Sequence, residues 1–329
     1  PGGSVTLTTA AGEIRGAMSG DPFKIDTGAP SGALVATVIG DATTGINIEN
    51  SGTGDVKATL STASGQARLV TGGGLTTDAS DWMADSFDVT SDGDMTLDRG
   101  VTADAGDIAL ASNTGAISIG DDVIATAGNI MLTAVDLVVG SGGTLSASGM
   151  GGGDVTIARS TDGGINVGGG SFGAVTSISS YLTVDNDELN SITATNLTIG
   201  DANHTQFLRV QNVQDPDAAS GAMTSELAHQ SIDKFILRAE GANSAVRIAG
   251  DQSSFFKALD VRAGAGIEVG RDITTTVGGL SLDADSDMAD GMPGAFFTAD
   301  HDVLTLTGGR ILTTLGMPAD APDITLRGR

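Results

Sequence analysis

The sequence predicts an all-β protein, a right-handed parallel β-helix (β-solenoid) of roughly 15 coils with about 22 residues per coil. A five-residue phrase recurs at 93–97, 106–110, 115–119 and 128–132, and alternate copies lie 22 positions apart (115 − 93 and 128 − 106). Each phrase begins with Gly and then, apart from Met131, alternates polar or small residues with apolar ones. This is the period of a strand with one buried face. Right-handed winding follows from the usual handedness of parallel crossovers.

The same pattern predicts one continuous solenoid over residues 1–329. Strand-like pieces separated by turns rich in Gly, Asp, Asn and Ser run through the whole chain, but the spacing is irregular before residue 90. Two stretches lack the alternation, and the first of these predicts a short helix or a protruding loop. The expected segments are irregular coils 1–90, regular coils 91–210, an interruption 211–234, regular coils 235–282, an interruption 283–300 and final coils 301–329.

Composition indicates narrow, stacked layers. The chain has 49 Gly, and aromatic residues make up only 3% of it. We therefore expect Ile, Val and Leu to stack inside the coils, with Thr, Ser and Asp outside. The single Trp, Trp82, is expected to fill a coil rather than to offer a platform for a sugar ring.

Charge and cysteine content limit the partners. The formal charge of −25 predicts repulsion from nucleic acids and from anionic membrane surfaces. No apolar run approaches the roughly 20 residues of a membrane-spanning helix, so no membrane span is expected. The absence of Cys excludes disulfides and thiolate metal sites.

Three phrases, Gly106–Leu110, Gly128–Ala134 and Asp185–Asp201, carry a resemblance. They resemble the repeat shafts of filamentous haemagglutinin-type secreted exoproteins, over about half of the chain, mostly residues 87–200 and 235–282. The resemblance implies a right-handed parallel β-helix that is exported by a two-partner or related pathway. It also implies a role as a surface adhesin or fibre.

The main functional hypothesis is an extracellular structural or adhesive β-helix shaft at the cell surface. In one form of this hypothesis the chain is a subunit of a head-to-tail filament. The chain is not expected to be an enzyme. The alternative is a carbohydrate-active β-helix enzyme (polysaccharide lyase or hydrolase) or a carbohydrate-binding module that uses Trp82 or the Phe pairs. Glycoside hydrolysis needs two carboxylates at a defined separation, and the many acidic turns mark no pair. His204, His229 and His301 lie far apart in the sequence. No catalytic residue is predicted.

No cofactor is expected, and calcium is the one metal hypothesis. Asp283, Asp285 and Asp287 match positions 1, 3 and 5 of a calcium-binding loop. The match then fails, because Met288 stands where the loop needs Gly and Gly294 where it needs Glu.

Interface residues are predicted at the terminal strands and at the Phe pairs. Terminal coils of a solenoid expose unpaired backbone and apolar layers unless something covers them. Such a cover is either flanking shaft or a second copy that stacks end to end and builds a filament. The Phe pairs either plug wide coils or form contact patches, and host or matrix glycans are further expected partners. The predicted interface residues are Val5, Leu7, Ile324, Leu326, Phe255, Phe256, Phe296 and Phe297.

Overall fold

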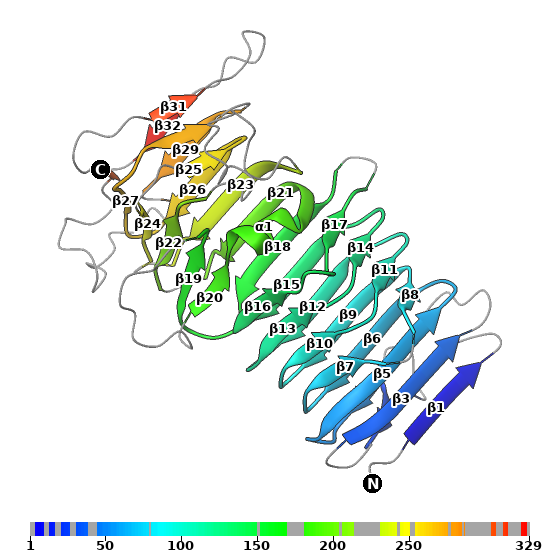
Figure 1. Ribbon diagram of the computed structural model, residues 1–329. Coiled ribbons are helices and arrows are strands. Elements are labelled where there is room, and N and C mark those ends of the chain that lie inside the picture. Colours follow the sequence, from blue (N-terminus) through cyan, green and yellow to red (C-terminus); the bar gives the residue numbers. More distant parts are fainter. Residues whose placement is uncertain are drawn as a thin grey trace. The chain divides into compact units, whose positions relative to one another are not determined.

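The chain folds into two compact units, Pro1–Val155 (unit 1) and Thr156–Arg329 (unit 2). The structure is a computed structural model. It describes residues 4–9, 13–16, 21–26, 31–38, 45–78, 80–149, 152–169, 181–203, 206–213, 231–241, 244–250, 254–275, 278–284, 286, 304–306, 312–314 and 324–327. Regular structure in these residues is parallel β-sheet, with one short helix. The predicted all-β parallel β-helix is therefore confirmed (Figure 1).

Unit 1 contains seventeen strands among its described residues. They are β1 (Ser4–Thr9), β2 (Phe23–Ile25), β3 (Ser31–Val38), β4 (Ile46–Asn50), β5 (Asp55–Thr62), β6 (Gln66–Thr71), β7 (Leu75–Thr77), β8 (Trp82–Ala84), β9 (Ser86–Ser91), β10 (Met95–Leu97), β11 (Val101–Ala103), β12 (Ile108–Ser112), β13 (Ala116–Ile119), β14 (Val123–Ala125), β15 (Ile130–Ala134), β16 (Asp136–Val139) and β17 (Leu145–Ala147). The boundary between the units falls within β18 (Asp154–Arg159).

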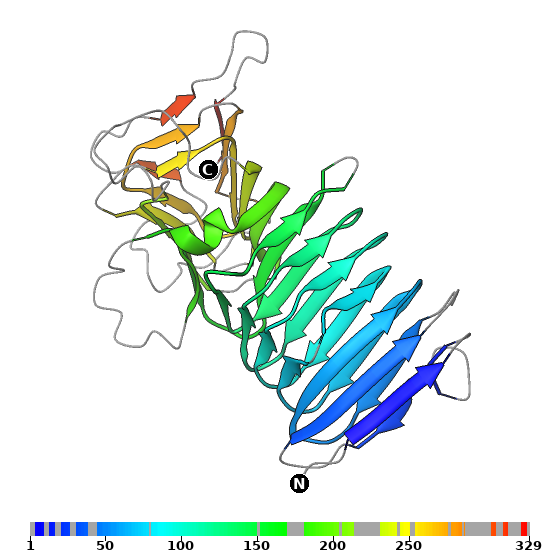
Figure 2. The same cartoon turned by 45° about the vertical axis from the view of Figure 1, so that its right-hand side comes forward.

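The strands of unit 1 form three parallel ladders among the described residues: β2–β4–β6–β9–β12–β15, β1–β3–β5–β7–β10–β13–β16 and β8–β11–β14–β17. Figure 2 shows their successive coils stacked side by side. The long strand β5 pairs with β7 near its start and with β8 near its end, so one strand of this coil is replaced by two in the next.

The predicted coil length is present in the centre of unit 1. Met95 pairs with Ile117, and Ile108 pairs with Ile130, which are both steps of 22 residues. Neighbouring coils depart slightly from this length, because Leu75 lies 20 residues before its partner Met95. In-register pairing stacks like residues and makes one continuous apolar column, in which Leu75, Met95 and Ile117 are almost completely buried.

One inward column of unit 1 is polar, contrary to the expectation that Thr and Ser lie outside. Asn50, Thr71, Ser91 and Ser112 pair in register and are at most 1% exposed. They lie where the chain turns out of this ladder and bond the turn backbone. Ser112 Oγ, for example, accepts from the amide of Gly115 at 3.0 Å. Buried turns need such partners, since an unpaired backbone group is costly, and the short polar side chain supplies them.

Trp82 is fully buried, and its indole Nε1 donates to the carbonyl of Ala58 at 3.0 Å. Its ring stacks on Phe87 with 6.0 Å between the ring centroids. The expectation of a coil-filling Trp is therefore confirmed. The alternative in which Trp82 stacks on a sugar is wrong, because a fully buried ring offers no face to a ligand.

Unit 2 contains the helix α1 (Asn186–Asn190) and fourteen strands after β18 among its described residues. The strands are β19 (Gly164–Val167), β20 (Tyr181–Val184), β21 (Ile192–Asp201), β22 (Leu208–Gln211), β23 (Ile232–Ala239), β24 (Val246–Ala249), β25 (Ser254–Phe256), β26 (Leu259–Ala263), β27 (Ile267–Val269), β28 (Ile273–Thr275), β29 (Leu280–Asp283), β30 (Leu304–Leu306), β31 (Leu312–Thr314) and β32 (Ile324–Arg327). Their parallel ladders are β21–β23–β26–β29–β32, β20–β19–β22–β24–β27–β30 and β25–β28–β31.

The coils of unit 2 differ in length. Leu259 pairs with Leu280, a step of 21, but Leu197 pairs with Phe235 and Leu280 with Ile324, steps of 38 and 44. The longer steps contain the two predicted interruptions. These two steps are therefore much longer than the predicted coil length of about 22 residues. One continuous solenoid across both units stays a prediction, as does right-handed winding.

A helix within the predicted regular coils was not expected. Asp185 caps α1 by accepting from the amide of Glu188 at 3.0 Å, and the Glu188 side chain accepts from the amide of Asp185 at 2.9 Å. This is a capping box, and its sequence signal, an N-cap residue with Glu three positions later, was available. The helix predicted within 211–234 falls on residues outside those described.

Candidate functional site

The acidic turns of unit 1 hold successive coils together. The Asp94 carboxylate accepts from the amide of Ala116 at 2.9 Å, and Asp107 accepts from the amide of Asn129 at 2.8 Å. Asn129 in turn accepts from the amide of Asp154 at 2.9 Å, so that turn residues from three successive coils are linked. These side chains bind backbone donors of the following coil. These side chains therefore tie successive coils together.

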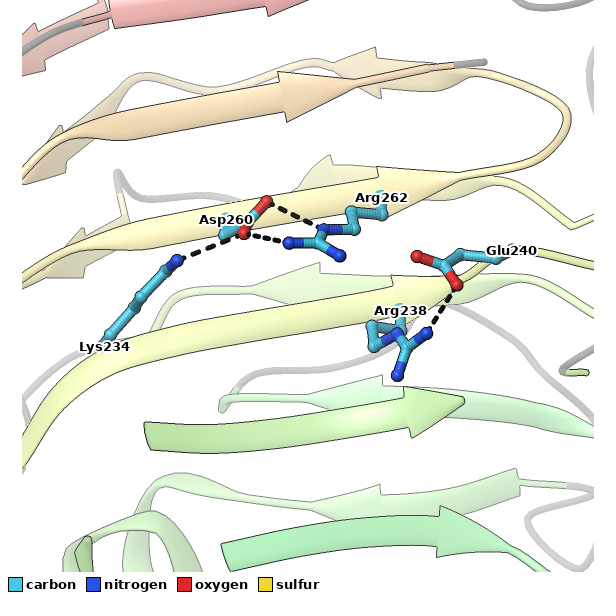
Figure 3. Close-up of polar contacts among 5 residues, drawn as sticks. All are labelled: Lys234, Arg238, Glu240, Asp260 and Arg262. Carbon is cyan, nitrogen blue, oxygen red and sulfur yellow. Dashed lines mark hydrogen bonds and ion pairs between the residues drawn. The ribbon is translucent and has the colours of Figure 1, made fainter. Parts of the chain in front are cut away.

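The outer face of unit 2 carries a charged cluster of five residues on and beside β23 and β26 (Figure 3). We use the name charged cluster for Lys234, Arg238, Glu240, Asp260 and Arg262. Alternation places these positions outside, because the intervening Phe235, Leu237 and Val261 are fully buried in the core. Strand pairing then brings together residues that are 26 positions apart in the sequence.

Asp260 is the centre of the charged cluster. Its side chain is only 8% exposed and accepts from Lys234 Nζ at 3.2 Å and from Arg262 Nη2 at 2.9 Å. Burial alone would raise the pKa of Asp260, but the hydrogen bonds and positive charges of Arg262 and Lys234 outweigh burial and lower it. The hydrogen bond to Asp260 raises the pKa of Arg262, against the opposing effect of burial. Asp260 and Arg262 are therefore both charged at neutral pH.

A second pair completes the charged cluster. Arg238 Nη2 donates to Glu240 at 2.7 Å, and Arg238 pairs in register with Arg262 on the next strand. Figure 3 shows Arg238 reaching toward Glu240, while Lys234 and Arg262 converge on Asp260. Three cations against two carboxylates leave this cluster at a formal charge of +1 on a chain of −25. An ionised Asp260 held by two cations cannot act as a general acid at neutral pH. The arrangement therefore fits ion pairing within a coil and, through Lys234 and Asp260, between two coils.

The calcium hypothesis falls mostly on residues outside those described, namely Asp285 and Asp287. Asp283 is described, and it pairs in register with Arg262 on one side and Arg327 on the other. The charge of Asp283 also supports the protonated form of Arg262. No group of three or more His, Asp or Glu side chains suited to a metal ion occurs in the described part of the chain. Calcium at this loop stays a prediction.

The predicted interface residues of the terminal strands differ in exposure. Val5 and Leu7 on β1 are partly buried. Ile324 and Leu326 on β32 are 43% and 46% exposed, although their column partners Leu280 and Leu282 are at most 1% exposed. The apolar column thus reaches the surface at β32.

Of the two Phe pairs, only the side chain of Phe256 is described, and it fits the alternative in which these residues plug a coil. Phe256 is fully buried and meets Phe235 edge to face, with 5.1 Å between the ring centroids. Phe256 as an interface residue is therefore wrong, because alternation directs its ring into the core. The side chain of Phe255 and both Phe296 and Phe297 lie outside the described residues.

His204, His229 and His301 also lie outside the described residues. Among those described, no helix is long and apolar enough to span a membrane. Comparison with known proteins gives no match to any family model, curated protein or solved structure.

Proposed function

We propose that the chain is a structural and adhesive β-helix shaft that is secreted and displayed at the cell surface. The observation that supports this proposal is that polar side chains form hydrogen bonds and ion pairs between neighbouring coils. Turn carboxylates such as Asp94 and Asp107 bind the backbone of the next coil, and Asp260 pairs with cations of its own and the adjacent coil. A shaft needs this kind of coil-to-coil bonding, and the resemblance to haemagglutinin-type exoproteins points to the same role.

The proposal includes association through β32. Ile324 and Leu326 expose an apolar column that is buried in every preceding coil of the same ladder for which exposure is described. A strand that continues the ladder would cover both side chains by parallel pairing. That strand belongs either to a second copy, which yields a head-to-tail filament, or to flanking shaft.

Negative-stain electron microscopy over a concentration series, with and without calcium, tests the shaft. We expect particles that join end to end as the concentration rises. Ile324→Lys should suppress the joining, because a charged side chain cannot be buried between coils. Met131→Lys is the matched control, since Met131 is 53% exposed on β15 of unit 1. Joining that Ile324→Lys leaves intact, or that Met131→Lys suppresses equally, would contradict the role of β32. Isolated particles at every concentration would exclude a second copy as the partner of β32 and would leave flanking shaft as the partner.

A further inference from the structure

A second polar column runs along the outer face of unit 2, on the ladder that contains β19, β22 and β24. Asn166 of β19 pairs in register with Arg209 of β22, which pairs with Arg247 of β24. Ile165 and Val167, on either side of Asn166, are fully buried in the core. The column Asn166–Arg209–Arg247 therefore faces away from the core.

Two atoms of this column lack a partner. Asn166 is 5% exposed, and neither its Oδ1 nor the Nε of Arg209 has a hydrogen-bond partner among the residues that the structure describes, although both atoms are buried. A buried polar atom without a partner destabilises the fold, so a ligand group that bonds to it gains affinity. One is an acceptor and the other a donor, on neighbouring strands in register. A single hydroxyl group suits both, since it accepts from Nε–H and donates to the amide oxygen.

Arg209 also lacks a carboxylate partner among the described residues. Its guanidinium lies over the ring of Phe207, 5.6 Å from the centroid, and Tyr181 lies 5.5 Å from the same ring. Arg247, the neighbour in register, pairs with Glu268 at 3.2 Å. Two like charges on adjacent strands repel each other, so the pair Arg209 and Arg247 would be stabilised by a bound anion.

We propose that this surface binds an acidic sugar. The carboxylate of a uronic acid unit lies against Arg209 and Arg247, and one ring hydroxyl bridges Arg209 Nε and Asn166 Oδ1. The sugar ring packs near Tyr181 and Phe207. A planar carboxylate matches the fork of a guanidinium, and aromatic rings pack well against the C–H face of a sugar.

Both unpartnered atoms lie beneath the surface, so binding requires Arg209 to lift from Phe207. Arg209 is only partly buried, and a cation–ring contact of this kind is weak at an exposed site. A charge-assisted pair with the sugar carboxylate, together with the bridging hydroxyl, outweighs this loss. The inference names a ligand class for the adhesive part of the proposed function and rests on that part.

Calorimetric titration with two matched oligosaccharides tests the inference. The probes are a tetramer of β-1,4-linked glucuronate and cellotetraose, which differ only at the carboxylate, with sodium sulfate as a third probe. We expect the acidic tetramer to bind and cellotetraose to bind much more weakly. The Nε–H signal of Arg209 in ¹H–¹⁵N spectra should shift on binding. Arg209→Gln should weaken the acidic tetramer by about 10-fold or more. Arg99→Gln, at an exposed arginine of unit 1, is the matched control and should leave affinity unchanged.

Three results would overturn the inference: no binding of the acidic tetramer at millimolar concentration, equal affinity in Arg209→Gln, or equal binding of sulfate, which would show an adventitious ion only. Hydrogen exchange of β22 and β24 in Arg209→Gln shows whether that variant keeps its fold.

Asn166→Ala provides a second test, because it should lose the hydroxyl contact and retain the preference for the acidic probe. The titrations use dilute chain below any assembly seen by microscopy. Failure of sugar binding and failure of the shaft are therefore distinguishable.

Discussion

Replacing Asp260 with Asn tests the ion pairing of unit 2. Asn keeps the size of the side chain but removes the charge that Lys234 and Arg262 face at 3.2 and 2.9 Å. The two cations are 41% and 44% exposed, so water partly compensates for the lost partner. Hydrogen bonds to charged groups contribute about 1.5–3 kcal/mol each when buried. With the exposure of the cations taken into account, we expect Asp260→Asn to destabilise this part of unit 2 by about 2 kcal/mol at pH 7.

Hydrogen exchange measured by mass spectrometry gives the required local readout. A loss of about 2 kcal/mol corresponds to roughly 30-fold faster exchange of the most protected amides in β23 and β26. The fluorescence of Trp82 reports on unit 1 and should not change. Asp104→Asn, at an exposed carboxylate of unit 1, is the control, and it should leave exchange in both units unchanged.

The pH dependence provides a further test of the same residue. The pKa of Asp260 in the folded chain is lowered from its ordinary value of 3.8, so the carboxylate stabilises the fold fully above about pH 4. That contribution is lost as the pH falls through the folded pKa. The difference in exchange between the wild-type chain and Asp260→Asn should therefore shrink below about pH 4. A difference that stays constant with pH, or no difference at pH 7, would refute the role assigned to this ion pair.

Two further substitutions test the stacking of unit 1. Gly128→Ala would place a Cβ 2.2 Å from the carbonyl oxygen of Gly106, so adjacent coils must separate; we expect a loss of more than about 2 kcal/mol in urea unfolding. Gly100→Ala, whose nearest contact would be 3.4 Å, is the control, and equal losses would contradict the clash. Trp82→Ala should cost about 3–5 kcal/mol, measured by circular dichroism, because it leaves a cavity and removes the hydrogen bond from the indole to the Ala58 carbonyl. Met83→Ala at the exposed neighbour should stay within about 0.5 kcal/mol, and a small effect of Trp82→Ala would show that the coil closes around the gap.

Much of the fold could be predicted from local pattern. The recurring phrases correctly predicted that Met95 would stack on Ile117 and Ile108 on Ile130. The inward column that includes Ser91 was not predicted, because period-two alternation does not distinguish a buried polar residue that bonds a turn from an exposed one.

The candidate sites could be predicted much less well. The charged cluster was missed because Lys234 and Asp260 become neighbours through a step of 24 residues between Phe235 and Leu259, which differs from the repeat. Arg209 was missed for the same reason, since it meets Asn166 through a step of 43 residues. Exposed charges carry no marker of their partners in a single sequence. The burial of Phe256 was also missed. Period two places Phe256 on the same face of its strand as Ser254, but the sequence does not show which face of this strand points inward.

The sequence by itself determined the strand period, the position of turns and the parallel stacking of the central coils, because these follow from alternation and from residues within one coil. The tertiary structure alone decided which coils lie next to each other across the long insertions of unit 2. It also decided that β20 lies on the side of β19 opposite β22, although β20 follows β19 in the chain. The physical reason is that the free-energy cost of closing a loop rises only slowly with its length. The length of an insertion therefore does not determine which strands pair, and the apolar columns and ion pairs that form between coils do.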